Sequence, residues 1–243
     1  HCGSFEKAKK LIILAKKNGA DAVKLQTYTP DMMTIKNNKF LIKDGIWKNI
    51  NLWKLYEEAQ TPLIWHYKLF ELAKKIKLKI FSTPFSSDAV DLLEKLKCEA
   101  YKIASFEMND LNLIKRVSLT KKPLIISTGL SSIKEIDKTY KTAKKYGCKD
   151  ITLLYCVSNY PSLIENFSMN NIKILKEKFK CKVGLSDHST DDLVMVSAVA
   201  AGAEVIEKHI ALENQKRGFD IKFSIKGKKI KNFITKMHDT AKL

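Results

Sequence analysis

The chain has 243 residues, 45% of them hydrophobic and 29% charged, and its formal net charge is +18. This composition is typical of a soluble globular protein, and the length can bury a sizeable core as one large α/β domain or as two small ones. No apolar run is long enough to cross a bilayer, so we expect no membrane association.

The positive charge comes mostly from lysines spread over helical segments such as KAKK, LAKKIKLK and TAKKYG. This spread is typical of solvated outer helix faces, and no arginine–aromatic ribbon or zinc-finger spacing accompanies it. We therefore expect no nucleic-acid partner.

The five cysteines form no CxxC pair, which favours a reducing cytoplasm. Free cysteines in such a protein are mostly packing residues, and a nucleophilic role for Cys2 is the less favoured interpretation. They are Cys2, Cys98, Cys148, Cys156 and Cys181.

Short β-branched or apolar runs alternate with longer segments of helical period, which predicts a parallel sheet built from βα units. The predicted strands are residues 22–26, 79–83, 100–104, 123–128, 151–156, 182–186 and 204–209. The predicted helices are residues 5–18, 61–77, 87–96, 109–120, 132–146, 168–180, 190–201 and 228–242.

Residues 28–60 form an insertion that is too long for an ordinary βα loop. It carries Trp47, Trp53 and Tyr56 among polar residues. These aromatic side chains indicate either a segment that covers a substrate or one that packs onto the sheet.

The chain begins at His1 without a methionine, directly before CGS and a predicted helix. We expect one further strand before His1, which would give eight βα units, the number in a (βα)8 TIM barrel. We therefore predict an α/β TIM barrel over residues 1–243 with its first strand missing. A doubly wound open sheet is the alternative, but no GxGxxG or Walker loop follows any strand.

Polar residues follow almost every predicted strand, and in a parallel barrel the carboxyl ends of all strands meet on one face. Serine and threonine at such positions also cap helices, but their recurrence on strand after strand favours a ligand site. These residues are Lys24, Gln26, Ser82, Thr83, Ser105, Glu107, Ser127, Thr128, Ser158, Tyr160, Ser186, Asp187, His188, Lys208 and His209.

His188 and His209 follow neighbouring strands, so their imidazoles are expected to lie roughly 5 Å apart. Two such ligands could share one divalent ion and leave positions for water and a substrate oxygen. The same residues could instead be hydrogen-bonded structural histidines, and Asp187 is either a ligand or a partner of a ligand.

Ser105, Ser127, Ser186 and Lys102 could surround a dianion such as a phosphate. The lysines also permit another chemistry, because a Schiff-base aldolase needs one desolvated lysine in or near a strand. Lys24, Lys102 and Lys208 are the candidates for that alternative.

The motifs HCGS, GADAVKLQTY, FSTPF, AYKIASFE, PLIISTG, CVSNYP, GLSDHS and GAEVIEKHIAL occur in this order along the chain. With them the sequence resembles the sialic acid synthase family over essentially its whole length. The segments YTPDMMTI and DGIWKNINLWKLYEEAQTPLIWH look more like the pseudaminic acid synthases of that family than like its N-acetylneuraminate or legionaminate synthases.

The resemblance implies a (βα)8 barrel that condenses phosphoenolpyruvate with an amino sugar. It implies that His188 and His209 hold a divalent ion such as Mn²⁺ or Mg²⁺. Lys102, Ser105, Ser127 and Ser186 would bind phosphoenolpyruvate, with Lys24 at its carboxylate, while Gln26, Thr83, Glu107 and Tyr160 would face the sugar or the forming bond.

In the implied reaction, C3 of phosphoenolpyruvate attacks the sugar aldehyde and a water adds to C2. Glu107 or Asp220 would deprotonate that water before phosphate leaves. Asp220 matches an acidic residue of the family, although the surrounding RGFDIKFS departs from the usual glycine, proline, aspartate pattern.

Family members also carry a C-terminal antifreeze-like domain that supplies an arginine to the partner subunit. We expect the full protein to be a domain-swapped homodimer, of which this chain is the barrel. A non-catalytic basic binding module stays open as a further alternative, besides the Schiff-base aldolase.

Overall fold

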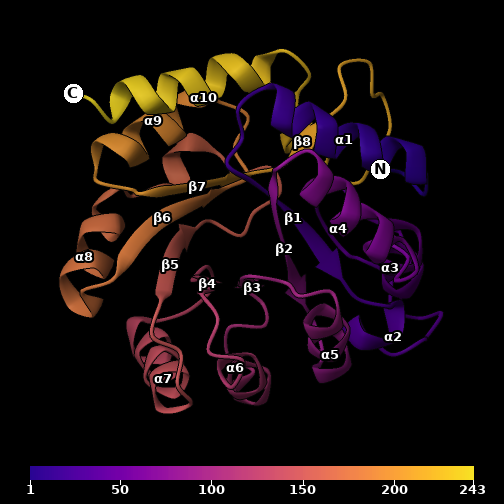
Figure 1. Ribbon diagram of the computed structural model, residues 1–243, viewed down its shortest axis with the longest axis horizontal. Helices are drawn as coiled ribbons and strands as arrows, with labels where there is room; N and C mark the ends of the chain where they lie inside the picture. Colours follow the sequence, from indigo (N-terminus) through magenta and orange to yellow (C-terminus); the bar gives the residue numbers. More distant parts are fainter.

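Seven parallel strands form one curled sheet in the computed structural model, which describes residues 1–243 (Figure 1). Each strand pairs with the next one along the chain, so that β1 and β7 are the two edges. The strands are β1 (Ala22–Thr27), β2 (Lys79–Pro84), β3 (Tyr101–Ile103), β4 (Leu124–Ser127), β5 (Ile151–Cys156), β6 (Lys182–Asp187) and β7 (Val205–Lys208). A separate pair joins β8 (Ile210–Ala211) to β9 (Ile225–Lys226).

Helices surround the outside of this sheet (Figure 1). The α-helices are α1 (Phe5–Lys17), α2 (Pro30–Met33), α3 (Leu52–Ala59), α4 (Trp65–Lys75), α5 (Ser87–Lys95), α6 (Leu111–Ser118), α7 (Ile133–Lys145), α8 (Asn170–Phe179), α9 (Asp192–Ala200) and α10 (Lys229–Thr240). Two short 3₁₀ helices, Ile164–Asn166 and Ile221–Phe223, complete the elements.

Local sequence signals explain where several of these helices begin and end. Ser132 caps α7 by accepting from the backbone N–H of Glu135, whose carboxylate accepts from the Ser132 N–H at 2.7 Å. The helix ends on Lys144 and Lys145, which place positive charge near its free carbonyls. In α1 the Ser4 side chain plays the same capping role.

The side chains of the strands alternate between the helices and the interior of the curled sheet. On β1, Val23 packs into an outer core with Ile12 of α1 and Leu69 of α4. Lys24 lies between Val23 and Leu25 and therefore points inward. This alternation separates the positions that build the hydrophobic core from those that can meet a ligand.

A buried hydrogen-bonded chain joins β1, β2 and α4 on the outer side of the sheet. The Thr27 hydroxyl lies 2.9 Å from Nε2 of His66 and 2.6 Å from the Ser82 hydroxyl. Nδ1 of His66 faces the Pro62 carbonyl oxygen at 3.3 Å, and burial lowers the pKa of the imidazole. The neutral ring thus links one helix to two strands.

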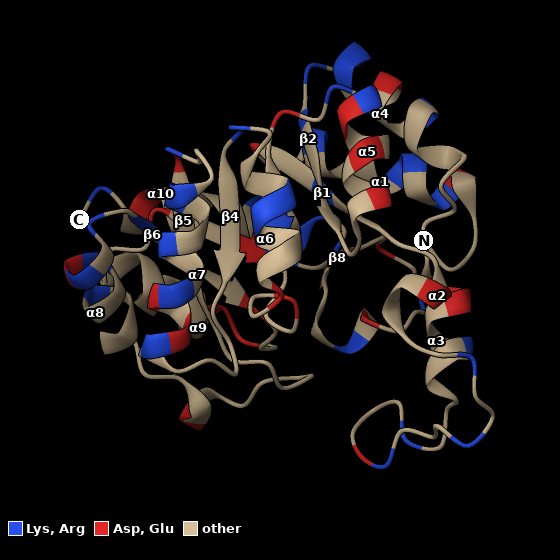
Figure 2. Ribbon diagram, turned by 90° about the horizontal axis from the view of Figure 1, so that it is seen from below, with Lys and Arg blue, Asp and Glu red and all other residues tan.

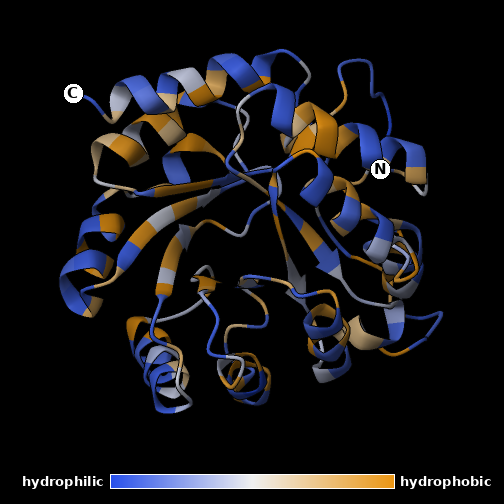
Figure 3. Cartoon of the chain, in the orientation of Figure 1, coloured by the Kyte–Doolittle hydropathy of each residue, from blue (hydrophilic) through white to orange (hydrophobic).

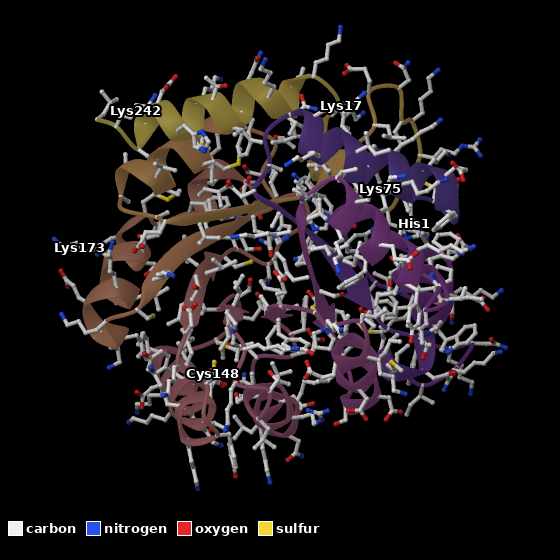
Figure 4. All side chains as sticks on the ribbon, in the orientation of Figure 1. His1, Lys17, Lys75, Cys148, Lys173 and Lys242 are labelled. Atoms are coloured by element: carbon white, nitrogen blue, oxygen red, sulfur yellow. The ribbon has the colours of Figure 1, made fainter.

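The outer faces of the helices are mostly hydrophilic, whereas apolar residues concentrate where helices meet the sheet (Figure 3). Lysine and arginine are spread over many of the helices (Figure 2). Lys173 and Lys242 lie at the edge of the molecule in Figure 4, and Lys17 and Lys75 are exposed as well. No helix combines the length and the apolar character needed to cross a membrane.

The seven predicted strands and the eight predicted helices are all present, with ends that differ by at most a few residues. The α/β barrel type of fold is confirmed in its βα alternation and its consecutive parallel order. The insertion contains two helices, α2 and α3, that were not predicted, and with its loop it lies to one side of the sheet (Figure 2). The short strands β8 and β9 were not predicted either.

Candidate active site

A half-buried carboxylate, Glu207 on β7, lies among two ammonium groups and a hydroxyl group from three other strands. Its oxygens lie 2.9 Å from Nζ of Lys24 on β1 and 3.3 Å from Nζ of Lys102 on β3. The Ser186 hydroxyl of β6 donates to it at 2.9 Å. Lys102 also donates to the Ser127 hydroxyl of β4 at 2.6 Å. We call Lys24, Lys102, Ser127 and Ser186 the lysine–serine cluster.

The charges in this cluster shift one another's protonation. Burial opposes ionisation of Glu207, but the ammonium groups of Lys102 and Lys24 outweigh it and hold the pKa of the carboxyl well below its usual range. Burial lowers the pKa of Lys102 to about 8, although Glu207 acts in the opposite direction. The site therefore keeps two cations and one anion close together, and only Lys102 among them is fully buried.

Two imidazoles lie on the same inward face, one step nearer to the strand ends. His188 is two residues after Ser186, and His209 is two residues after Glu207, so each ring lies about 7 Å along the strand from the lysine–serine cluster. The ring centroids of the two histidines are 5.6 Å apart. The predicted juxtaposition of His188 and His209 is confirmed.

The chemistry of the histidine pair fits a metal ion with two protein ligands. Nδ1 of His188 faces the Val157 carbonyl oxygen at 3.3 Å, and Nδ1 of His209 faces Oδ2 of Asp220 at 3.4 Å. Such contacts leave Nε2 of each ring for a ligand. Burial and the neighbouring His209 lower the pKa of His188 to about 3, which keeps its ring neutral. No group of three His, Cys, Asp or Glu side chains is arranged to hold a metal ion.

Three buried side-chain oxygen atoms have no hydrogen-bond partner: Oγ1 of Thr83, Oε2 of Glu107 and Oε2 of Glu207. The last of these still has the Lys24 ammonium as its ion-pair partner, at 2.9 Å. Buried polar atoms without a partner are uncommon, and at a site they are positions at which a ligand can bind. Burial raises the pKa of Glu107 to about 7, so this carboxyl can gain or lose a proton near neutral pH.

Gly129, directly after β4, leaves room for two hydroxyl groups. A Cβ atom at this position would lie 2.2 Å from Oγ of Ser158 and 2.9 Å from Oγ of Ser105. Any other residue would push into the space that these serines occupy, so the glycine is needed for the close approach of the strand ends.

Aromatic rings line the side of the site next to the histidine pair. Tyr160 lies with its ring centroid 4.5 Å from that of His188 and 5.4 Å from that of Phe223. Trp47 of the insertion extends this row, 5.5 Å from Tyr160. Asp220 contacts His209, whereas Gln26 is exposed and makes no side-chain hydrogen bond.

Four of the polar residues after the strands face away from this site. Asp187 and Lys208 pair with each other on the outer side, and Lys208 also donates to the Ser189 carbonyl oxygen. Ser82 bonds to Thr27, and Thr128 donates to the Leu154 carbonyl oxygen. The interpretation of Asp187 as a metal ligand is therefore wrong, because its strand position directs it to the helices, and the same geometry removes Lys208 as a Schiff-base lysine.

The central carboxylate was not among the predicted site residues. A signal for it exists in EVIEKH, because Glu207 and His209 are two residues apart and must share one face of the strand. Gly129 was also missed, since no local pattern distinguishes a glycine that avoids a distant serine from one in an ordinary turn.

Known proteins are similar to this chain in sequence. The NeuB family matches residues 11–243. The pseudaminic acid synthase of Campylobacter jejuni is 46% identical over 227 residues, which cover 93% of this chain and 66% of that protein. The enzyme of the same name from Helicobacter pylori is 45% identical over 227 residues, covering 93% of this chain and 67% of its own. The chain thus spans about two thirds of the length of these relatives.

A solved structure is similar to this chain in its fold. The N-acetylneuraminic acid synthetase of Leptospira borgpetersenii, in complex with citrate, superposes with a TM-score of 0.91 at 28% identity. The superposition covers 100% of this chain and 80% of that one. Because the family match takes in nearly the whole chain, and the relatives agree in sequence and fold, the chain belongs to the NeuB family, which confirms the family identified from its motifs.

Proposed function

We propose that the chain is the catalytic barrel of a pseudaminic acid synthase. This enzyme would condense phosphoenolpyruvate with 2,4-diacetamido-2,4,6-trideoxyaltropyranose and release a nonulosonic acid and phosphate. The observation that carries the proposal is the placement of the lysine–serine cluster and the histidine pair on one inward face. The names of the Campylobacter and Helicobacter relatives support the choice of product.

The lysine–serine cluster is suited to phosphoenolpyruvate, which carries a phosphate and a carboxylate. Lys102, Ser127, Ser186 and the nearby Ser105 would donate to the phosphate, and Lys24 would meet the carboxylate. Glu207 balances the two ammonium groups in the absence of substrate. Neutral hydroxyl donors hold a phosphate without binding it so tightly that it cannot leave.

His188 and His209 would hold a divalent ion such as Mn²⁺ or Mg²⁺, which when bound would act as a Lewis acid on the sugar aldehyde. The two Nδ1 contacts orient the rings for this role. Gln26, Thr83 and Tyr160 would bind the sugar, and the unpartnered hydroxyl of Thr83 supports a contact there.

In the reaction, the C2=C3 π electrons of phosphoenolpyruvate form a bond from C3 to the aldehyde carbon, which leaves a cationic C2. The carbonyl π bond of the aldehyde breaks, and its oxygen becomes an alkoxide that takes up a proton to give a hydroxyl group. Water adds to C2 and gives up its proton, and the tetrahedral intermediate then releases phosphate by cleavage of its C–O bond. We assign the proton transfer to Glu107, because its carboxyl titrates at about 7 and one of its oxygens is free. Asp220 is the second carboxylate, beside the histidine pair.

Phosphate release tests the function directly. The protein is incubated with phosphoenolpyruvate, Mn²⁺ and either the trideoxy sugar or N-acetylmannosamine, and we expect faster release with the trideoxy sugar. Faster release with N-acetylmannosamine would instead identify an N-acetylneuraminate synthase. A substrate–lysine adduct trapped by borohydride would identify an aldolase.

The metal role has its own test. EDTA should abolish phosphate release and added Mn²⁺ should restore it. His209→Ala should lose turnover and weaken Mn²⁺ binding measured by calorimetry, whereas His238→Ala, on the exposed face of α10, should change neither. Turnover that is insensitive to the chelator would remove the metal from the proposal.

We further propose that the longer protein acts in the cytoplasm as a homodimer. The five free cysteines support a reducing compartment, and the dimer rests on the family resemblance. Light scattering on the full-length protein should give twice the monomer mass, and a monomer mass would contradict the proposed dimer.

A further inference from the structure

Trp47 of the insertion lies beside the site. Its ring lies 5.5 Å from that of Tyr160, and the Tyr160 ring lies 4.5 Å from that of His188. These rings form a continuous row from the histidine pair to the insertion, which we call the aromatic row.

Trp47 is held in a fixed orientation. Its indole N–H donates to the Phe219 carbonyl oxygen at 3.1 Å, in the segment that also carries Asp220. The residue is half-buried, so one part of its ring is packed and another part is accessible. A fixed indole with an accessible surface is suited to pack against the C–H groups of a ligand.

The histidine end of the aromatic row is open enough to admit a substrate, since the side chain of His209 is 31% exposed and that of Asp220 is 42% exposed. An open-chain sugar with its aldehyde at the histidine pair carries C6 at its opposite end. Trp47 lies at the opposite end of the aromatic row from His188. The Trp47 and Tyr160 rings present ring carbon there, which favours a methyl group over a hydroxymethyl group.

On the basis of the proposed function, we propose that Trp47 is a specificity-determining residue for the amino sugar. Its indole packs against the apolar face of the sugar at the C6 end and thereby selects a 6-deoxy sugar over a 6-hydroxylated one. An apolar contact of this size discriminates between substrates by roughly 10- to 200-fold.

Steady-state kinetics of Trp47→Ala and Trp47→Phe test this role. We expect KM for the trideoxy sugar to rise about tenfold or more in Trp47→Ala, and less in Trp47→Phe, which keeps a ring. KM for phosphoenolpyruvate should stay within about twofold, because the lysine–serine cluster is unchanged. The preference for the trideoxy sugar over its 6-hydroxy analogue, which differs from it at C6 alone, should fall.

Trp53→Ala is the matched control. Trp53 belongs to the same insertion, but its indole N–H donates to Asp31 at 2.9 Å and its ring stacks under Lys36. It makes no contact with the aromatic row, so its removal should leave both the sugar KM and the preference within about twofold. An equal effect of the two alanine variants would overturn the role of Trp47.

Sugar binding can be followed without turnover, through tryptophan fluorescence. Titration of Trp53→Phe with the trideoxy sugar should change the emission, and titration of Trp47→Phe should change it much less. If the wild-type protein releases no phosphate but this difference is seen, the proposed function fails and the Trp47 contact stands. If the wild type turns over and the emission change survives in Trp47→Phe, the contact is refuted and the function stands.

Discussion

Glu207 and Glu107 show how burial acts on two carboxyl groups in opposite ways. Glu207 is half-buried between two ammonium groups, and its pKa is held below the usual range. At Glu107 burial outweighs the opposing effect of the Lys102 ammonium, and the pKa is raised to about 7. The ionised carboxylate is therefore stabilised at Glu207 and disfavoured at Glu107.

Glu207→Gln should destabilise the protein by about 3–5 kcal/mol at pH 7, because it leaves the buried ammonium group of Lys102 and the half-buried one of Lys24 without their counterion. The depressed pKa means that this contribution is full above the ordinary glutamate pKa of about 4.3 and is lost on acidification. The gap between wild type and variant, measured by urea unfolding, should therefore narrow below about pH 4.

The control for that experiment is Glu204→Gln, three residues earlier. Glu204 pairs with Lys176 at 3.0 Å, but both side chains are more than 40% exposed. Such a pair contributes about 1 kcal/mol or less. An equal loss of stability in both variants would show that the contacts of Glu207 are no stronger than those of a surface ion pair.

Glu107→Gln should lower kcat by roughly 10²- to 10⁴-fold, because it removes the proposed base. In the wild type kcat/KM should rise with pH through about 7, the pKa of Glu107, and in the variant this rise should disappear. A pH profile that is the same in both proteins would exclude Glu107 as the base.

Glu107→Gln should also stabilise the folded protein at alkaline pH, whereas Glu207→Gln should destabilise it. A carboxyl whose pKa is raised by folding makes the wild type progressively less stable as the pH rises from about 4.3 to about 7. The glutamine variant lacks this loss, so it should be more stable than the wild type at pH 8, by up to about 3 kcal/mol, and similar to it at pH 4.

At the scale of the elements, the chain of Ser82, Thr27 and His66 ties β1 and β2 to α4. Thr27 directly follows Gln26, whose side chain points into the curled sheet. Ser82 directly precedes Thr83, whose side chain also points inward. The outer hydrogen bonds thus fix the two strand ends that carry inward side chains.

Thr27→Val should cost about 1–3 kcal/mol, because it leaves the buried Nε2 of His66 and the Ser82 hydroxyl without their partner. The midpoint of urea unfolding should fall while the slope stays constant. Thr142→Val on α7, where the hydroxyl bonds to the Lys138 carbonyl oxygen at an exposed position, should change stability by less than about 0.5 kcal/mol.

The elements differ in how far the sequence predicts them. The strands are predicted well because each is a short apolar run between helices of clear period, as in residues 151–156. The helices α2 and α3 were missed because α2 has only four residues and α3 lies within a polar insertion. Short elements depend on tertiary contacts, such as the bond from Trp53 to Asp31, that periodicity does not contain.

Prediction of the site from the sequence is limited in a similar way. Position at the carboxyl end of a strand predicts which residues lie near the site. The direction of each side chain, into the curled sheet or toward the helices, then decides whether that residue enters the site. His188 and His209 are inward and were predicted, whereas Asp187 and Lys208 are their immediate neighbours in the sequence and face outward. A one-residue difference in phase thus separates a side chain that faces the site from one that faces the helices.

At the scale of the whole molecule, the net charge of +18 should attract anionic substrates. We expect kcat/KM for phosphoenolpyruvate to fall by roughly threefold or more between 10 mM and 500 mM salt, because salt screens the field. The value for the uncharged sugar should change much less. Equal salt dependence for both substrates would argue against attraction of the anion by the protein's charge.

The alternation of inward and outward residues on β1, β6 and β7 has a consequence for genetics. Suppose that every residue of these strands were substituted and that each variant were scored in cells for protein abundance and for product formation. Substitutions at positions that face the helices would lower abundance. Substitutions at the inward positions between them would lower product formation while abundance stayed normal. The two scores would form stripes of period two that are displaced by one residue. A variant library would therefore read the direction of each side chain without any coordinates.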